Sequence, residues 1–255
     1  MVENPYIDLD CHNNVLRIGL NRPHKKNALT GAMYDTLRLA LLEAEKKPDI
    51  KAVMFHGTAD AFCAGNDLKG FDNRDPNSPS PAQKFLMVIQ AFKKPVVAAV
   101  SGIAVGIGVT MLLHFDLVYA TADTRFRLSF VNLGVCPEAG SSLLLTESAG
   151  IKKASEVLML GDFFDTKKAI ELGIVNGAVS SRDLLNFVTQ KAEQLAQKPQ
   201  QALLLIKQLI KKGNQQAVVA RMALEAEFFG KLLLTEESID ARAKLKNKIQ
   251  KSKDA

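Results

Sequence analysis

Several absences narrow the classes of protein to which this 255-residue chain can belong. It has no Trp and only 6% aromatic residues, so it lacks the interleaved aromatic and basic side chains typical of nucleic-acid-binding surfaces. Its three cysteines are widely spaced and odd in number, which argues against a disulfide framework and favours a reducing compartment. No secretory hydrophobic segment stands at the N-terminus. We therefore expect an intracellular, cytoplasmic protein.

The net charge of +6 is concentrated near the C-terminus. Residues 241–255 contain six basic side chains and one acidic side chain, so the rest of the chain is close to neutral. A basic tail of this kind is usually the solvated end of a helix. We expect no nucleic-acid partner, and the mildly basic surface suits an anionic ligand that carries phosphates.

One run, residues 96–113, is uncharged over about the length of a membrane span. Three glycines interrupt it, Pro95 precedes it, and Asp116 follows it closely. We interpret the run as a buried strand, a Gly-rich turn and a buried helix, and we expect no membrane association.

The hydrophobic pattern predicts an α/β chain. A hairpin is expected over residues 7–20 around Asn13 and Asn14, and Thr30 is expected to cap a helix over 31–46. Strands are predicted at 51–57, 95–100 and 115–121, loops at 21–29, 57–68 and 70–81, and mostly helix from residue 139, with a last long helix over 217–250. This βαβ order favours parallel strands with helices outside.

Two loops have the composition of a backbone anion site. Ala64 and Gly65 precede Asn66 in the segment AFCAGNDL, and Ile107 lies between Gly106 and Gly108 where a strand turns into a helix. Glycine lets the backbone approach a ligand, and the first N–H groups of a helix have no internal acceptor. The alternative is that these glycines serve only tight packing. The spacing is not a dinucleotide-binding fingerprint, because position 111 is Met.

Five segments, taken in order and spacing, resemble the crotonase (enoyl-CoA hydratase/isomerase) superfamily. They are NRPHKKNAL, AFCAGNDL, KPVVAAVSGIAVGIG, FDLVYATADTRF and LGVCPEAGSS, and the likeness extends over about residues 5–250. The resemblance implies a crotonase-like spiral of ββα turns over residues 1–195 and a C-terminal helical trimerisation region over 196–255. It also implies an acyl-CoA thioester as substrate, no cofactor beyond that coenzyme A, and a homotrimer or dimer of trimers.

The resemblance also implies roles for particular residues. The backbone N–H groups of Asn66 and Ile107 would form an oxyanion hole, although the family commonly has Gly at the second position. The two carboxylates of the family's hydratases would fall at Thr110 and Phe130, and neither is an acid. Glu138 matches the single glutamate of the monofunctional Δ3,Δ2-enoyl-CoA isomerases, with Phe130 and Val131 as apolar walls beside it.

Other readings stay open at this point. Glu138 after Pro137 also suits the first turn of a helix, where acidic side chains are favourable. The chain could instead be an enoyl-CoA hydratase, could catalyse another crotonase-type reaction, or could bind acyl-CoA without turnover.

The resemblance further implies that basic residues of the 21–29 loop meet coenzyme A phosphates, and that the two donor loops line the substrate. The candidate binding residues are Arg22, Lys25, Lys26, Ala64, Gly65, Asp67, Leu68, Gly106, Phe130 and Pro137. The 70–81 loop would be part of the acyl pocket or a lid, or a plain surface insertion. The four histidines show no metal-ligand spacing, so we expect no metal, and Cys136 is interpreted as a small buried thiol.

Overall fold

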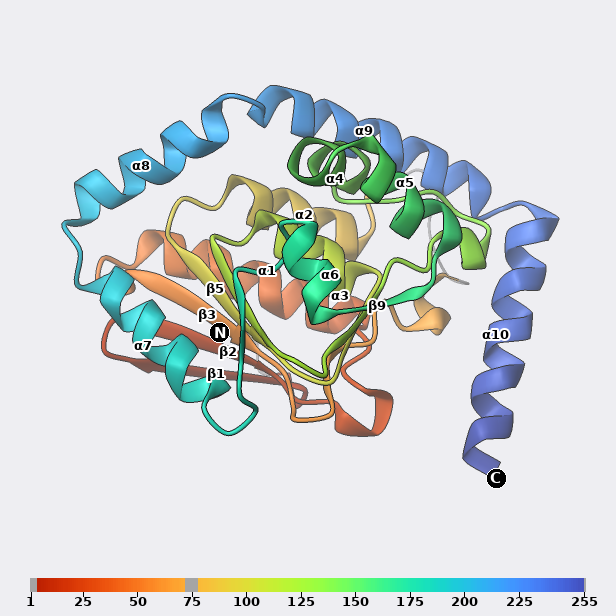
Figure 1. The fold of residues 1–255 in the computed structure, drawn as a ribbon, viewed down its shortest axis with the longest axis horizontal. Coiled ribbons are helices and arrows are strands. Elements are labelled where there is room, and N and C mark those ends of the chain that lie inside the picture. Colours follow the sequence, from red (N-terminus) through yellow and green to blue (C-terminus); the bar gives the residue numbers. More distant parts are fainter. Residues whose placement is uncertain (1–3, 72–77, 255) are drawn as a thin grey trace.

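Two β-sheets stand at the centre of the computed structural model, which describes residues 4–71 and 78–254 (Figure 1). The larger sheet has the order β1-β2-β3-β5-β7-β10, and the smaller has β4-β6-β8-β9. The larger sheet consists of β1 (Ile7–His12), β2 (Val15–Leu20), β3 (Ala52–His56), β5 (Val96–Val100), β7 (Leu117–Thr121) and β10 (Gly177–Val179). The smaller consists of β4 (Ala61–Cys63), β6 (Ile103–Val105), β8 (Arg125–Arg127) and β9 (Phe163–Asp165).

The chain alternates between the two sheets as it advances. Each of β3, β5 and β7 joins the larger sheet in parallel, and the strand that follows it, β4, β6 or β8, joins the smaller sheet. Antiparallel pairing occurs at one edge of each sheet, between β1 and β2 and between β8 and β9. The predicted α/β class and parallel core are therefore confirmed, and the repeating step gives a spiral.

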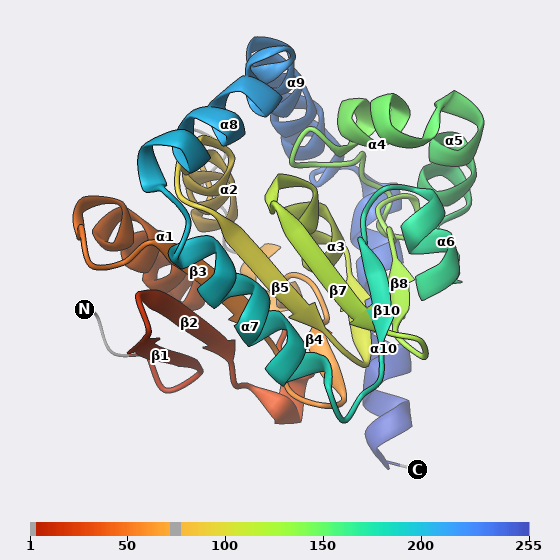
Figure 2. The same ribbon diagram turned by 60° about the vertical axis from the view of Figure 1, so that its left-hand side comes forward.

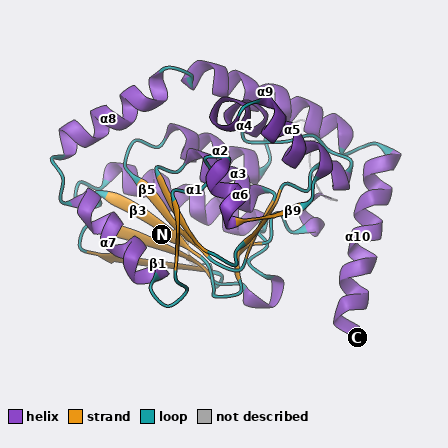
Figure 3. Ribbon diagram, in the orientation of Figure 1, coloured by secondary structure: helices purple, strands orange, loops and turns teal. Residues whose placement is uncertain are grey.

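Helices surround the sheets (Figure 3). Those before residue 180 are α1 (Gly31–Lys46), α2 (Pro81–Ala91), α3 (Ile107–Thr110), α4 (Ser141–Ala149), α5 (Ile151–Leu160) and α6 (Thr166–Glu171). Those after it are α7 (Leu184–Ala196), α8 (Gln200–Lys212), α9 (Gln215–Leu232) and α10 (Glu236–Asp254). In Figure 1, α8 and α9 arch over the sheets, and α10 runs down one side to the C-terminus.

The larger sheet is covered on both faces. On one face α7 lies across β3, β5 and β7 (Figure 2), and its Val188 and Ala192 belong to one hydrophobic cluster with Met54 and Val97. The other face belongs to the main hydrophobic core, which also takes in α1, α2 and the smaller sheet. Buried runs such as VVAAV in β5 follow from this coverage, because a parallel strand between two layers exposes neither face.

Several local predictions are confirmed. Asn13 and Asn14 have positive φ angles of 50° and 63°, as the tight turn of a hairpin requires, and β1 pairs with β2 in that register. The first long helix covers residues 31–46, and the Thr30 side chain accepts a hydrogen bond from the Met33 N–H. The uncharged run 96–113 is divided among β5, β6, α3 and a 3₁₀ turn at Met111–His114. In the part of the chain that the structure describes, no helix is long and apolar enough to cross a membrane.

Other boundary predictions were wrong. The loop predicted at 57–68 contains β4. The region after residue 139 is mostly helix, as predicted, but it also contains β9 and β10, because strands of three residues are too short to show an alternating pattern. The helix predicted over 217–250 is two helices. Thr235 separates them, because its side chain accepts from the Ser238 N–H and Glu236 and Glu237 favour a new helix start. Of the 70–81 loop, residues 72–77 lie outside the described residues.

Asn27 ties the 21–29 loop to the end of β4. Its side-chain amide is fully buried, accepts from the Arg22 N–H at 2.7 Å, and donates to the carbonyls of Ala61 and Phe62 at 2.8 and 3.2 Å. Sequence reasoning described this loop as polar and gave its basic residues a role in binding coenzyme A, but it gave no role to Asn27. Asn27 instead satisfies backbone groups that the short strand β4 leaves available.

We predict that Asn27→Ala lowers the free energy of unfolding by about 2–3 kcal/mol, because it leaves buried backbone groups unsatisfied. Chemical denaturation followed by circular dichroism measures the change. Asn21→Ala, an exposed asparagine in the same loop, is the matched control and should change stability little. Equal stability of the two variants would contradict this account.

Candidate active site

The two Gly-containing loops are brought together by the parallel pairing of β4 with β6. Ala61 pairs with Ile103 and Cys63 with Ala104, so the segments that follow both strands leave the sheet side by side. A Cβ atom on Gly108 would lie 2.4 Å from the Cys63 carbonyl oxygen, a distance that no larger residue could occupy. The packing role expected as an alternative is therefore real for Gly108. The same contact places the two loops backbone against backbone.

The Asn66 N–H is the first candidate donor. Neighbouring N–H groups in its loop are engaged: that of Ala64 bonds to the Lys26 carbonyl and that of Asp67 to the Leu29 carbonyl, both at 2.9 Å. The Gly65 N–H lies 3.4 Å from the Cys63 sulfur. Within residues 4–71 and 78–254, the Asn66 N–H has no acceptor, because a parallel bridge to Leu29 uses the groups on either side of Asn66 and not its own.

The Ile107 N–H is the second candidate donor. Gly106 caps α3 with a φ of 55°, a conformation that favours glycine, and its own N–H bonds to the Arg127 carbonyl. The next N–H, that of Ile107, starts the helix and has no acceptor among the described residues. A Cβ atom on Gly106 would meet no described atom within 4 Å, so there is room for a ligand there. The Ile107 side chain itself is buried in the core.

Glu138 does not start a helix, contrary to the alternative interpretation, because α4 begins at Ser141. Its carbonyl oxygen accepts from the Ser141 N–H at 3.0 Å and the Ser141 hydroxyl at 2.6 Å, so the segment turns before the helix. The carboxyl atom Oε1 is buried, and the residue as a whole is half-buried. At least one oxygen of the carboxyl group is therefore shielded from bulk solvent.

Tyr34 bonds to the loop that carries the first candidate donor, and sequence reasoning missed it. Its hydroxyl donates to the Asn66 side-chain oxygen at 2.5 Å. Burial, followed by the negative charge of Glu138, raises the pKa of Tyr34 well above its ordinary value, so the hydroxyl stays protonated. Burial also raises the pKa of Cys63 to about 12, and the charge of Glu138 adds to that rise. The charge of Glu138 therefore acts on Tyr34 and on Cys63, which directly precedes residues 64–66 (the AGN loop).

The positions matched to hydratase carboxylates are buried and carry no acid. Thr110 is fully buried in α3, and its hydroxyl has no hydrogen-bond partner in the described part of the chain. Phe130 is buried as well, as predicted for an apolar wall. Val131 is 48% exposed, so the prediction that it helps to exclude water was wrong. It begins a 3₁₀ turn that directs its side chain outward.

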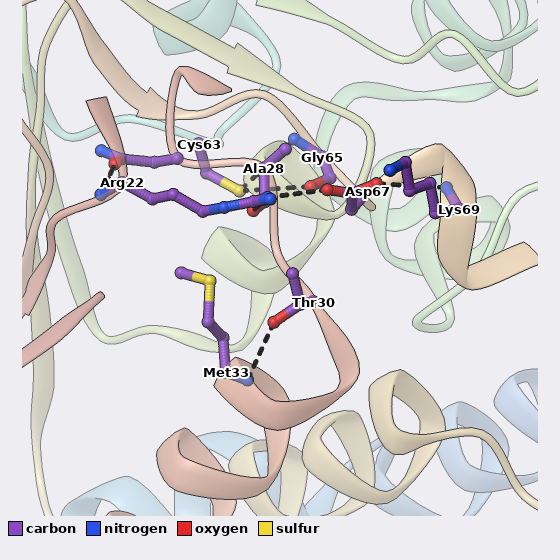
Figure 4. A network of polar contacts seen from close by, with 9 residues as sticks. Arg22, Ala28, Thr30, Met33, Cys63, Gly65, Asp67 and Lys69 are labelled. Atoms are coloured by element: carbon purple, nitrogen blue, oxygen red, sulfur yellow. Dashed lines mark hydrogen bonds and ion pairs between the residues drawn. The ribbon is translucent and has the colours of Figure 1, made fainter. Parts of the chain in front are cut away.

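Arg22 is held by an ion pair inside the loop network (Figure 4). Its Nη1 donates to the Asp67 carboxylate at 2.7 Å and to the Ala28 carbonyl at 2.9 Å. Partial burial acts to raise the pKa of Asp67, but the hydrogen bonds from Arg22 and the Lys69 N–H outweigh it and lower that pKa. Arg22 therefore braces the AGN loop, whereas Lys25 and Lys26 are exposed.

The structure also places the remaining candidates, Leu68, Pro137 and Cys136. Leu68 begins a 3₁₀ turn at Leu68–Phe71, and Pro137 is half-buried beside Glu138. Burial raises the pKa of Cys136 to about 11, which agrees with an inert thiol. Across residues 4–71 and 78–254, no three His, Cys, Asp or Glu side chains gather in a way that could hold a metal ion.

Comparison with known families agrees with this geometry. The family model described as Enoyl-CoA hydratase/isomerase matches residues 10–251. The chain belongs to the enoyl-CoA hydratase/isomerase family. The crotonase resemblance is therefore confirmed, and the family acts on acyl-CoA thioesters.

Individual relatives of this enoyl-CoA hydratase/isomerase family member carry different reaction names. The chain is 32% identical to rat "Enoyl-CoA delta isomerase 2", with 94% of this chain and 63% of that protein aligned, so it spans less than two thirds of the relative's length. It is 33% identical to "2,3-dehydroadipyl-CoA hydratase" of Escherichia coli, over 88% of each. The solved structure of Pseudomonas aeruginosa OdaA is 36% identical and superposes with a TM-score of 0.92, covering 95% of this chain and 99% of that one. The crotonase fold is thus confirmed.

The Arg22–Asp67 ion pair generates a prediction about stability and pH. Because Asp67 has a lowered pKa in the folded protein, the pair stabilises the fold above the ordinary aspartate pKa of about 4 and loses this effect as the pH falls further. We expect Arg22→Ala to lower the free energy of unfolding by about 2 kcal/mol at pH 7.

Chemical denaturation of the wild type and Arg22→Ala at several pH values measures the difference, which should shrink in acid. Lys26→Ala, an exposed cation of the same loop, serves as the control. A stability difference that stays constant down to pH 3 would contradict the assignment of the ion pair.

Proposed function

We propose that the protein is a Δ3,Δ2-enoyl-CoA isomerase, which moves a 3-enoyl-CoA double bond to the 2-position. One observation carries the proposal: Glu138 has a buried carboxyl oxygen and its charge acts on Tyr34 and Cys63, while Thr110 and Phe130 occupy the positions of the two hydratase carboxylates. Isomerisation needs one base that moves one proton, whereas hydration by the family's usual scheme needs two carboxylates, one to activate water and one to deliver a proton to the α carbon.

The proposed reaction begins at the thioester carbonyl. Its oxygen accepts hydrogen bonds from the N–H groups of Asn66 and Ile107. Glu138 removes a proton from C2, and the electrons pass into a dienolate whose oxygen carries the negative charge. The same carboxyl group then returns the proton to C4, which leaves the double bond between C2 and C3. No water and no cofactor besides the coenzyme A of the substrate enters the balance.

The surroundings suit an enolate. Preset donors that need no reorientation stabilise developing charge most strongly where water is excluded. Phe130 is buried, and the hydroxyl of Tyr34 holds the Asn66 side chain and thereby steadies the loop that presents the first donor. These features support a site built for oxyanion stabilisation.

Coenzyme A would bind beside the 21–29 loop in this proposal. Lys25 and Lys26 are exposed there and suit its phosphates, whereas Arg22 is engaged with Asp67 and Ala28. The substrate contacts then come from the backbone of residues 64–68 and 106–107.

We also propose that residues 196–255 form a trimerisation region. In α8, four apolar side chains are more than half exposed: Leu205, Ile206, Leu209 and Ile210. An apolar helix face of this kind suits burial against another copy of the chain. Sedimentation equilibrium measures the oligomeric state of the protein. A monomer at micromolar concentration would argue against the proposed trimerisation region.

The hydratase reaction is the second candidate, since a relative named as a hydratase is 33% identical. Parallel assays with 2-enoyl and 3-enoyl thioesters separate the two reactions. Rapid hydration of crotonyl-CoA would favour the hydratase, and thioester binding without turnover of either substrate would favour a non-catalytic acyl-CoA-binding protein.

Glu138 is expected to be essential for turnover. Glu138→Gln keeps the shape of the side chain but cannot take up the proton, so we expect kcat for 3-enoyl-CoA isomerisation to fall about 100- to 10,000-fold. The value of kcat is measured from the change in absorbance as the 2-enoyl thioester forms. The dissociation constant for a saturated acyl-CoA should stay nearly unchanged, and full activity of the variant would remove Glu138 from the mechanism.

The Ile107 donor can be tested without changing any polar side chain. Ile107→Pro removes the N–H at the first helical position, where proline is tolerated, and Ile107→Ala loses similar core packing but keeps the N–H. We expect kcat of the proline variant to lie about 100-fold or more below that of the alanine variant. The initial rates of the two variants are compared at saturating 3-enoyl-CoA. Equal rates in the two folded variants would show that this N–H does not serve the reaction.

A further inference from the structure

We propose that Glu225 in α9 is a positioning residue for Glu138: it holds the turn from which the Glu138 side chain reaches the reacting carbons. This inference rests on the proposed function, because it assigns Glu225 a role through Glu138. Glu225 is a buried carboxylate remote in sequence from every site residue described above, and the proposed mechanism does not use it.

The contacts of Glu225 converge on the segment directly after Glu138. Its Oε2 accepts from the Gly140 N–H at 2.6 Å, and its Oε1 accepts from the Ser142 N–H at 3.0 Å and the Ser142 hydroxyl at 2.6 Å. Arg221, one turn earlier in α9, donates to the same hydroxyl at 3.0 Å. Within the described part of the chain, the hydrogen bonds that this carboxylate accepts therefore come from two residues at the start of α4.

Glu225 replaces a missing helix cap. Gly140 stands at the N-cap position of α4 and has no side chain that could bond to the first N–H groups. A carboxylate from another helix supplies both the acceptors and a negative charge at the positive end of the helix dipole. Burial raises the pKa of Glu225, and the hydrogen bonds from Ser142 and Gly140 oppose that rise.

The turn itself needs external support. Ala139 and Gly140 both have positive φ angles, 64° and 71°, and alanine rarely adopts this conformation. Such backbone persists where surrounding contacts determine it. His114 donates from Nε2 to the Ala139 carbonyl at 2.8 Å; burial lowers its pKa to about 4, so the ring is neutral. His114 thus holds Ala139, and Glu225 in α9 holds Gly140. The two residues directly after Glu138 are therefore fixed by two different elements.

The consequence for Glu138 is geometric. A base that must reach both C2 and C4 of one substrate tolerates little displacement, and misplacement by about 1 Å can cost on the order of 100-fold in rate. Losing the Glu225 carboxylate releases Gly140 and the first turn of α4 together. Substrate binding does not depend on this turn in the same way, because the proposed thioester donors belong to the two glycine loops.

The test compares Glu225→Gln with a matched control on the same helix. Glutamine keeps the size of the side chain, but its NH₂ group would face the Gly140 N–H, so one acceptor is lost. We expect kcat for 3-enoyl-CoA isomerisation to fall about 10- to 100-fold, with KM changed less than about twofold. Glu227→Gln removes a carboxylate that pairs with Lys231 on the exposed side of α9 and should leave both constants unchanged.

The fate of the abstracted proton distinguishes a misplaced Glu138 from a general loss of structure. In D₂O, a misplaced Glu138 should release more of the abstracted proton to solvent, so the Glu225→Gln product should carry more deuterium at C4 than the wild-type product. Ser142→Ala, which removes one of the three donors, provides a milder variant that should lie between the two in kcat and in deuterium content.

The outcomes are distinguishable. If Glu225→Gln has the same kcat and the same deuterium content as the wild type, the positioning role of Glu225 is overturned. The proposed function is then unaffected. Absence of isomerisation by the wild type would overturn the proposed function and this role with it. Hydrogen exchange by mass spectrometry adds a readout without substrate: unchanged protection of residues 139–142 in Glu225→Gln would also overturn the proposal.

Discussion

The parallel pairing of β4 with β6 is the contact on which the rest of the site depends. Each strand has only three residues, yet their pairing sets the two glycine loops against each other. Gly108 lies against the Cys63 carbonyl so closely that any side chain there would force the loops apart. Because the Asn66 and Ile107 N–H groups belong to the backbone of these loops, their arrangement follows from strand pairing and not from side-chain flexibility. A site made of main-chain groups is therefore as rigid as the sheet that carries it.

Support for this rigid core comes from the C-terminal helices. Lys207 in α8 is buried and donates to the Asp116 carboxylate at 2.6 Å and the Lys94 carbonyl at 2.7 Å, and Lys211 donates to the His114 carbonyl at 3.1 Å. Burial lowers the pKa of Lys211 to about 8. These lysines fasten the inner side of α8, while its apolar outer side stays exposed. In the same region, α9 contributes Glu225. The helices that follow the spiral thus pack against the back of the site as well as forming an outer surface.

Much of the fold could be predicted because its signals are local or ordered along the chain. Asn13 and Asn14 specify a hairpin turn by their tolerance of positive φ, and the Thr30 side chain marks the start of α1 within one residue. The five family segments identified the crotonase fold, which the comparisons confirmed. Short strands such as β9 and β10 escaped prediction, because three residues carry too little periodicity and their pairing partners lie far away in sequence.

The sequence by itself determined the α/β class, the hairpin, the first long helix, the family and the candidate residues Asn66, Ile107 and Glu138. Only the tertiary structure decided that Arg22 braces Asp67, that Tyr34 bonds to Asn66, and that Glu225 caps α4 beside Glu138. Residue type and spacing encode local conformation, because neighbouring residues share the same few backbone angles. A hydrogen bond between distant segments depends instead on where the whole core places two side chains, and no local pattern records that distance.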